Sequence, residues 1–293
     1  MKNFYKKLSF IFALVLLAQY AWAQGVTTSS MTGAVTDPSG MALPGATVVA
    51  VHTPSGTQYG TATNVDGRFS IQNMRIGGPY TVKVSYVGFQ TKTINSITLR
   101  LAEPFVLNAS LAEGGTDLQE VVITGTKDKL LNAERNGAIT NVGTAEIERL
   151  PTVSRSLNDF TRLTPQANGS SIGGGNYRQN QITVDGADFN NNFGIGGNMP
   201  AGGSPISLDA IQEISVNVTP YDIRQSGFIG SSVNAVTRSG TNEFSGSVYT
   251  YFRNQNQQGD KVGSEKVAMQ DMQFNQYGFR LGGPILKNKL FFF

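Results

Sequence analysis

Apolar and polar side chains alternate along two stretches near the C-terminal end of the sequence. The first stretch, Thr241–Asn254, places Phe244, Gly246, Val248, Thr250 and Phe252 on one face and Ser245, Ser247, Tyr249, Tyr251 and Arg253 on the other. The second stretch alternates Tyr277, Phe279, Leu281 and Ile285 with Gln276, Gly278, Arg280 and Gly282. A period of two predicts β-strands with one apolar and one polar face.

A strand of a soluble sheet can show the same alternation, so the lengths of the connections decide between a soluble sheet and a membrane barrel. A long polar segment, Asn254–Met272, joins the two stretches, and a short turn, Lys287–Lys289, leads into Leu290–Phe293. One long and one short connection is typical of outer-membrane barrels. We therefore expect residues 241–293 to begin a transmembrane β-barrel. Plugged transporters have about 22 strands, so we expect the chain to be a truncated fragment of a longer protein.

Short strand-like runs separated by turn residues fill residues 24–112. Ala46–Val51 and Tyr80–Tyr86 are strand-like, whereas Asp37–Gly40 and Pro54–Gly56 interrupt the pattern. Regular spacing of short strands predicts a β-sandwich of about eighty residues. The expected fold class is mainly β.

The first 23 residues have the three parts of a secretory signal. Lys2, Lys6 and Lys7 give a basic start, Leu8–Ala18 is apolar, and Ala21–Ala23 forms a cleavage signature before Gln24. The apolar run is shorter than the roughly 20 residues of a transmembrane helix. We therefore expect residues 1–23 to be a signal peptide and the protein to be exported.

Composition narrows the classes of function. The formal net charge is +3, and the predicted signal alone carries three lysines, so the mature chain is near neutral. It lacks a basic patch interleaved with aromatic residues, which argues against nucleic acid as a partner. Cysteine is absent, which excludes a disulfide framework and a lipidated cysteine. After the signal no apolar run is long enough for a transmembrane helix, so membrane insertion would require a closed barrel.

Motifs for catalysis and metal binding are weak. Gly169–Gly173 matches G-x-S-x-G, but glycines follow it in place of a helix. The single histidine, His52, lies in a distant strand, where we expect a surface or edge position. Asp185–Asn190 offers oxygen ligands but lacks the late glutamate of a calcium loop, which leaves only adventitious calcium open. We expect no enzyme, no cofactor and no metal site.

Three phrases in the N-terminal region, "GAVTDPSGMALPGATVVA", "TATNVDGRFSI" and "YTVKVSYVGFQT", resemble the carboxypeptidase-regulatory-like, transthyretin-like sandwich. The resemblance implies that Gly67 lies in a tight turn before a core aromatic residue, Phe69. It implies an accessory module, a spacer or docking domain, without peptidase activity. Carbohydrate binding, which some relatives of this fold show, is a secondary alternative.

Residues 113–126 form a linker that contains a short strand-like segment. Taken alone, the segment could be an edge strand of the sandwich, but its place after Gly114 and Gly115 favours an exposed peptide that can pair with another protein's sheet. "LQEVVITGT" resembles the TonB box of TonB-dependent outer-membrane receptors. The resemblance implies contact with a TonB-type energy-transducing protein in the periplasm through Leu118, Gln119, Glu120, Val121, Val122, Ile123 and Thr124.

Residues 127–240 resemble the α+β plug of the same receptors. The sequence favours two short helices, the first with a capping-type threonine and glutamate at its start and a proline at its end, and three strands like those of the plug. These elements are Thr144–Pro151, Ser156–Pro165, Gln181–Gly186, Leu208–Val216 and Gly230–Asn242. With "FRLGGPILKNKLFFF" and the sandwich, the chain is identified as a member of the TonB-dependent receptors, similar to the Oar-like branch of the Bacteroidota.

The segment between Ala187 and Pro205 is rich in glycine and asparagine. The resemblance implies that loops here lie at the outer apex of the plug and contact ligand; the candidates are Phe189, Asn190, Asn191, Asn192, Phe193 and Asn198. We expect a receptor in the outer membrane, in contact with its lipid, that admits a scarce extracellular solute when the plug is remodelled. Iron chelates, oligopeptides and oligosaccharides remain open as solutes. The alternative is a surface adhesion protein that binds carbohydrate or protein.

Overall fold

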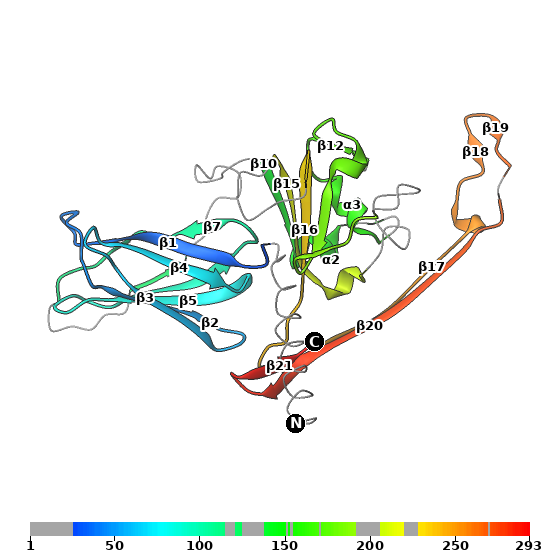
Figure 1. Ribbon diagram of the computed structural model, residues 1–293. Coiled ribbons are helices and arrows are strands. Elements are labelled where there is room, and N and C mark those ends of the chain that lie inside the picture. The colour runs from blue at the N-terminus through cyan, green and yellow to red at the C-terminus, as the bar shows by residue number, and fades with distance from the viewer. Residues whose placement is uncertain are drawn as a thin grey trace, which may run out of the picture. The chain divides into compact units, whose positions relative to one another are not determined.

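The computed structural model describes residues 26–114, 121–124, 138–150, 152, 155–169, 171–191, 206–219, 228–268 and 270–293. The chain divides into two compact units, 1–238 and 239–293 (Figure 1). The predicted signal peptide, residues 1–23, lies outside the described residues. So do Leu118, Gln119 and Glu120 of the predicted coupling segment.

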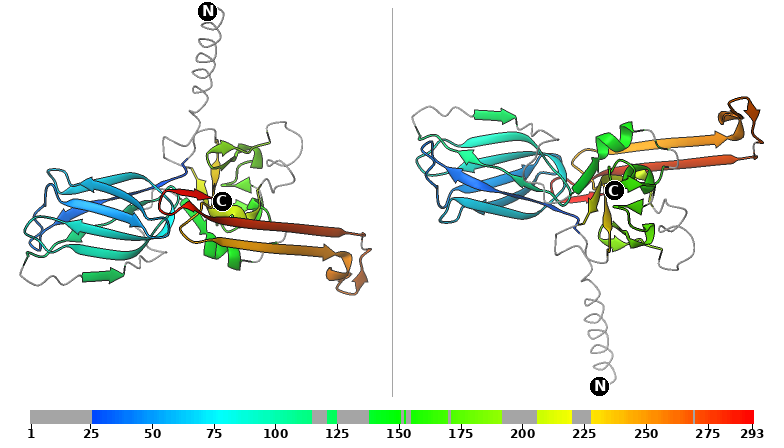
Figure 2. Two further views of the ribbon diagram at one scale, coloured as in Figure 1. Left: turned by 90° about the horizontal axis from the view of Figure 1, so that it is seen from below. Right: turned by 90° about the horizontal axis from the view of Figure 1, so that it is seen from above.

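The N-terminal part of the first unit is a two-sheet sandwich, as the spacing of short strands predicts (Figures 1 and 2). One sheet has the order β4-β1-β7, with β8 also paired to β1, and the other has the order β3-β2-β5-β6-β9. The strands are β1 Ser29–Thr36, β2 Thr47–His52, β3 Thr57–Ala62, β4 Arg68–Met74, β5 Gly77–Ser85, β6 Lys92–Leu99, β7 Pro104–Val106, β8 Ala109–Ser110 and β9 Val121–Thr124.

Alternate side chains from the two sheets form the core of the sandwich. On β5, Tyr80, Val82 and Val84 are fully buried and the residues between them are more exposed. Gly67 has φ +70°, and Phe69 two residues later is buried in the core. A Cβ at Gly67 would lie 2.7 Å from the Val35 carbonyl oxygen. Both expectations for the "DGRF" turn are therefore confirmed.

His52 is buried at 4% exposure, so the expectation of a surface or edge position is wrong. Its strand, β2, lies between β3 and β5, and its ring packs on Tyr80 with ring centroids 4.9 Å apart. Nδ1 shares a hydrogen bond of 2.7 Å with Ser55 Oγ. Burial lowers the pKa of His52 to about 4, and the charge of Arg75 adds to the effect. The alternation that buries Val48 and Ala50 on the same strand is the signal that predicts this position.

The rest of the first unit is built on a five-stranded mixed sheet of order β10-β15-β16-β13-β14. β15 and β16 are buried along nearly their whole length, since they are interior to the sheet. β13 runs parallel to β16, and the other pairs are antiparallel. The five strands are β10 Ala138–Gly143, β13 Gln181–Val184, β14 Ala187–Asp188, β15 Ile211–Val218 and β16 Ser231–Thr237.

Two short helices pack against the mixed sheet within the segments that the sequence favours, although the N-cap of α2 is Gly143 in place of Thr144. They are α2 Thr144–Arg149 and α3 Leu157–Thr161. Ser156 Oγ accepts a hydrogen bond from Asn158 N at the start of α3, and Phe160 is buried in the core of the sheet. Smaller elements complete this part: β11 Ala167–Asn168, β12 Ser171–Ile172, η2 Tyr177–Gln179 and η4 Leu208–Ala210.

The second unit is a long antiparallel hairpin followed by a third strand. β17 Ser245–Asn254 and β20 Gln273–Leu286 pair over ten residues of each strand, and the turn at Lys287–Lys289 leads into β21 Leu290–Phe292. Figure 2 shows β17 and β20 side by side along their length. Between them lie η5 Gln255–Gln257, β18 Lys261–Val262 and β19 Glu265–Lys266.

The two faces of this C-terminal hairpin differ as the alternation predicts. Cross-strand pairs Val248–Phe279 and Thr250–Tyr277 share one face, and Val248, Phe279 and Tyr277 are 75–87% exposed. On the other face Arg280 Nε donates to Ser247 Oγ at 2.8 Å. Among the described residues no helix is long and apolar enough to cross a membrane.

Candidate functional site: the coupling strand and the mixed sheet

The four described residues of the predicted coupling segment form β9, which pairs in parallel with β6 of the sandwich. The Cα partners are Lys92–Val121, Thr93–Val122, Ile94–Ile123 and Asn95–Thr124. These residues therefore form an edge strand of the sandwich, the alternative that the segment taken alone allows. The interaction of this segment with a partner protein stays a prediction.

The chain leaves the sandwich beside the start of β6. Gln90 N donates to Ala112 O at 2.9 Å, and Gly114 N donates to Gly88 O at 2.7 Å. A Cβ at Gly114 would lie 3.0 Å from Gly88 O, so a glycine permits this close approach. The hydrogen bonds hold residues 112–114 against the turn that precedes the strand to which β9 pairs.

A buried carboxyl group on β15 contacts the turn after β6. Glu213 is 5% exposed, and its Oε1 accepts a hydrogen bond from Leu101 N at 3.2 Å. The Leu101 carbonyl accepts one from Asn141 Nδ2 on β10 at 3.3 Å. Burial raises the pKa of Glu213 to about 7, and the Leu101 N–H and Arg100 oppose this rise. The turn is thereby fastened to the first two strands of the mixed sheet.

The "VDG" turn closes the other side of the mixed sheet. Asp185 has φ +50° and Gly186 has φ +82°, left-handed conformations typical of aspartate and glycine in turns. The Asp185 carboxylate accepts from Thr237 N at 2.8 Å and from Thr237 Oγ1 at 2.7 Å. It thereby ties the end of β13 to the end of β16.

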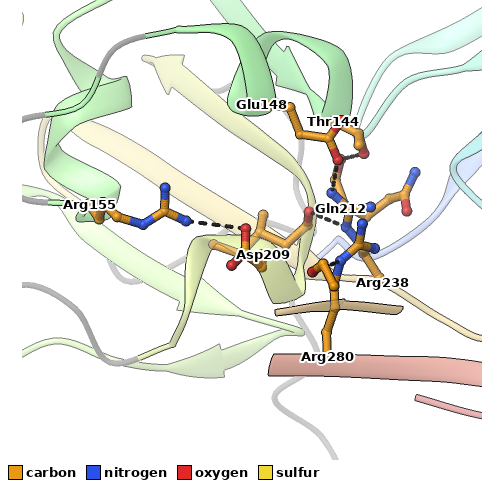
Figure 3. Close-up of polar contacts among 9 residues, drawn as sticks. Thr144, Glu148, Arg155, Asp209, Gln212, Arg238 and Arg280 are labelled. Carbon is orange, nitrogen blue, oxygen red and sulfur yellow. Dashed lines mark hydrogen bonds and ion pairs between the residues drawn. The ribbon is translucent and has the colours of Figure 1, made fainter. Parts of the chain in front are cut away.

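Polar contacts also join α2 to the sheet and the residues before α3 to η4 (Figure 3). Arg238 pairs with Glu148 at 2.9 Å and donates from Nε to Ile211 O at 3.2 Å. Thr144 Oγ1 donates to Gln212 O at 2.9 Å. Arg155 pairs with Asp209 at 3.2 Å, as Figure 3 shows. Sequence reasoning missed these pairs because their members are 27 to 90 residues apart.

The described part of the predicted ligand-contact segment is attached to the mixed sheet. Phe189 is half-buried and packs on the core. Asn190 Oδ1 accepts from Ile182 N at 2.7 Å, and its Nδ2 donates to Asn180 O at 3.1 Å. Asn191 is half-buried, whereas Asn192, Phe193 and Asn198 lie outside the described residues. Ligand contact by this segment stays a prediction.

The polar contacts above hold strands and turns together, and β9 is joined to β6 by parallel pairing. In the part of the chain that the structure describes, no three histidine, aspartate or glutamate side chains gather as a metal-binding group.

Two domain families match the chain at its two ends. Residues 30–112 match the carboxypeptidase regulatory-like domain, and residues 236–293 match an outer membrane beta barrel domain. The first match covers the sandwich and the second covers the C-terminal hairpin. Together with the relatives below, they place the protein in the outer membrane.

Two curated proteins resemble the chain over most of its length. The chain is 28% identical to the TonB-dependent transporter Oar of Myxococcus xanthus, over 94% of this chain and 27% of the relative. It is 26% identical to the TonB-dependent receptor P39 of Formosa agariphila, over 71% of this chain and 18% of the relative. The chain therefore spans about a quarter or less of the length of these relatives, which are named as a transporter and a receptor and not as enzymes. The chain is similar to these two proteins over 94% and 71% of its own length.

Solved structures resemble parts of the chain at low overall similarity. The siderophore receptor PirA of Acinetobacter baumannii matches with a TM-score of 0.39 and 24% identity over 51% of this chain and 22% of that chain. A catechol 1,2-dioxygenase of Acinetobacter radioresistens matches with a TM-score of 0.26 and 13% identity over 35% of this chain and 57% of that chain.

Proposed function

We propose that the chain is the N-terminal part of an outer-membrane receptor that takes up a scarce solute by energised remodelling of a plug. The observation that carries the proposal is the order of the parts. In chain order, a sandwich whose last strand is the edge strand β9 comes first, a mixed sheet follows, and a hairpin with an exposed apolar face comes last. The relationship to a TonB-dependent transporter and a TonB-dependent receptor supports the same order.

Each part has a role in this proposal. Residues 1–23 direct export, the sandwich is an accessory domain, and residues 127–240 are the plug. The apolar face of β17 and β20 contacts membrane lipid, because the outer surface of a transmembrane barrel carries apolar side chains. The sandwich and the phrase "FRLGGPILKNKLFFF" favour the Oar-like branch of the Bacteroidota.

Chain connectivity determines where an applied force arrives. A TonB-type protein in the periplasm pairs with the segment Leu118–Thr124 and pulls it. The next described element in the chain is β10, which is an edge strand and pairs with one neighbour, β15, through six residue pairs. An edge strand leaves its sheet without breaking the pairs of the inner strands. Peeling β10 is therefore the first step of plug remodelling in this proposal.

Deletion of residues 118–124 from the full-length receptor tests the function. A strain that lacks the gene is first scored for accumulation of iron chelates, oligopeptides and oligosaccharides, which identifies the solute class. The wild-type gene should restore accumulation of that class, while the deletion variant should bind the solute at the surface without accumulating it. Accumulation by the deletion variant at the wild-type rate would falsify the proposed role of this segment.

A second measurement separates uptake from adhesion. Dissipation of the proton gradient should abolish accumulation within minutes, because the energy-transducing partner depends on that gradient. If the amount of solute held by the cells stays at the wild-type level both after gradient loss and after the deletion, the protein is instead an adhesion protein.

A further inference from the structure

The sheet edge on which β9 rests is short and bounded. β6 pairs with β5 on one side and with β9 on the other, and β9 is opposite only Lys92–Asn95. The next residue, Ser96, has φ +61°. Pairing between β5 and β6 shifts register there, with Tyr80 opposite Ile97 and Val82 opposite Ile94. This shift marks a β-bulge on β6, which interrupts the edge at that point.

The pairing between β9 and β6 is short and parallel, and both features limit its stability. Parallel pairs are slightly less stable per residue than antiparallel ones, and only four residue pairs join β9 to β6. By comparison, β5 pairs with β2 along six residue pairs in antiparallel register. The contact between β9 and β6 is therefore the one that we expect to open first when the coupling segment is pulled.

A short tether keeps β9 close to this edge. Gly114 is hydrogen-bonded to Gly88, just before β6 begins, and β9 begins at Val121. Residues 115–120 alone connect the two points. A short connection raises the effective concentration of one element at the other into the millimolar range, so β9 returns readily to β6 after release.

We propose that the β6 edge is the resting site of the coupling strand, and that the energy-transducing protein must take β9 from β6 before it can load the plug. The inference rests on the proposed function. β9 is connected to the sandwich on its N-terminal side and to residues 138–238 on its C-terminal side. While β9 is held on β6, a pull on it loads the sandwich. Once β9 is released, the pull reaches β10.

Engineered disulfides test this inference, since the chain has no cysteine of its own. Thr93 and Val122 are Cα partners, and adjacent strands lie about 4.8 Å apart, within disulfide reach. The full-length receptor carrying Thr93→Cys and Val122→Cys should form the bond on oxidation. The matched control carries Thr93→Cys and Thr124→Cys, which are two residues out of register and about 7–8 Å apart, and it should form little bond.

The probe is the purified C-terminal domain of the periplasmic TonB-type protein, and its binding to the receptor is measured in detergent. Oxidation of the in-register variant should weaken binding at least tenfold, and a reductant should restore it. The out-of-register variant should bind equally under both conditions. Undiminished binding by the oxidised in-register variant, or equal disulfide formation in the two variants, overturns the inference.

Failure of the inference and failure of the proposed function give different results. If the deletion of residues 118–124 abolishes accumulation but the oxidised in-register variant still binds the probe, the coupling role stands and the resting site on β6 is wrong. If the deletion leaves accumulation unchanged, the proposed function fails whatever the disulfide result.

Discussion

The sandwich and the C-terminal hairpin are both β-structure, but they place their phenylalanines in opposite surroundings. Phe69 on β4 is 5% exposed and lies in the sandwich core, whereas Phe279 on β20 is 82% exposed. Both strands alternate with a period of two, so the secondary structure does not explain the difference. The sandwich has a second sheet that covers its apolar face, and the described part of the hairpin has none. The comparison teaches that the covering of an apolar face, and not the strand pattern, separates a soluble sandwich from a strand suited to membrane lipid.

The largest expected effect comes from removing a core side chain of the sandwich. Phe69→Ala should lower the free energy of unfolding of the sandwich by about 3–5 kcal/mol, because the lost burial is joined by a cavity. Urea unfolding followed by pulse proteolysis of the full-length protein measures the change. Val65→Ala, at a position 82% exposed in the same domain, should change it by less than about 0.5 kcal/mol. Equal effects at the two positions would contradict the assigned core.

A charge on the exposed apolar face should have the next largest effect. Phe279→Arg should destabilise the full-length barrel by about 2–4 kcal/mol if the position lies near the bilayer midplane. The heat-dependent mobility of the barrel on gels reports its assembly. Gln276→Arg, whose side chain lies on the opposite face, should be tolerated. If both variants assemble as well as the parent barrel, the apolar face of this hairpin does not contact lipid.

Local patterns predicted the elements of both regions. Alternation predicted β17 and β20, Ser156 capped the helix that follows it, and Gly67 lay in the turn before Phe69. These signals are local because side-chain direction, helix capping and left-handed turns depend on a few neighbouring residues. They suffice for fold class.

Contacts between distant segments were not predicted. The pairing of β9 with β6 depends on a sheet edge that forms only when the sandwich folds, so the place of the segment after two glycines favoured an exposed peptide. The contact of Glu213 with Leu101 joins residues 112 positions apart. The burial of His52 depends on β2 being an inner strand, although the alternation along β2 already marks the face that it shares with Val48 and Ala50.

Two buried ionisable groups, His52 and Glu213, lie in the first unit. We expect the free energy of unfolding of that unit to depend on pH through them. The pKa of His52 is lowered to about 4, so the unfolded chain binds more protons between pH 4 and 6.5 and stability rises with pH there. The pKa of Glu213 is raised to about 7, so the folded chain binds more protons between pH 4.5 and 7 and stability falls with pH there.

The two contributions should offset each other between about pH 4.5 and 6.5 in the parent protein. Glu213→Gln retains an oxygen acceptor for Leu101 N and removes the titration. Its free energy of unfolding should therefore rise with pH over this range, by on the order of 1–3 kcal/mol. Urea unfolding at half-unit pH steps measures the slope. A variant that stays flat across the range would show that His52 is not held neutral.

The smallest expected difference between the two units is in how much their ion pairs contribute to the free energy of unfolding. Arg238 pairs with Glu148, with the arginine side chain 12% exposed, and it also donates to Ile211 O. Lys266 and Asp260 approach only to 3.7 Å, with the lysine side chain 76% exposed. Exposed pairs contribute about 0–1 kcal/mol, and partial burial with a further hydrogen bond favours the upper end.

Arg238→Ala should therefore lower the stability of the mixed sheet by about 1–2 kcal/mol, and Lys266→Ala should have no measurable effect on the barrel. Salt separates electrostatics from packing, because 1 M NaCl screens charges beyond about 3 Å. The loss at Arg238 should shrink only partly in salt, since the hydrogen bond to the Ile211 carbonyl is buried with its strand. A loss at Arg238 that vanishes in salt would mean that this contact is as solvated as the one at Lys266, and the contrast between a covered and an uncovered unit would not extend to their charged residues.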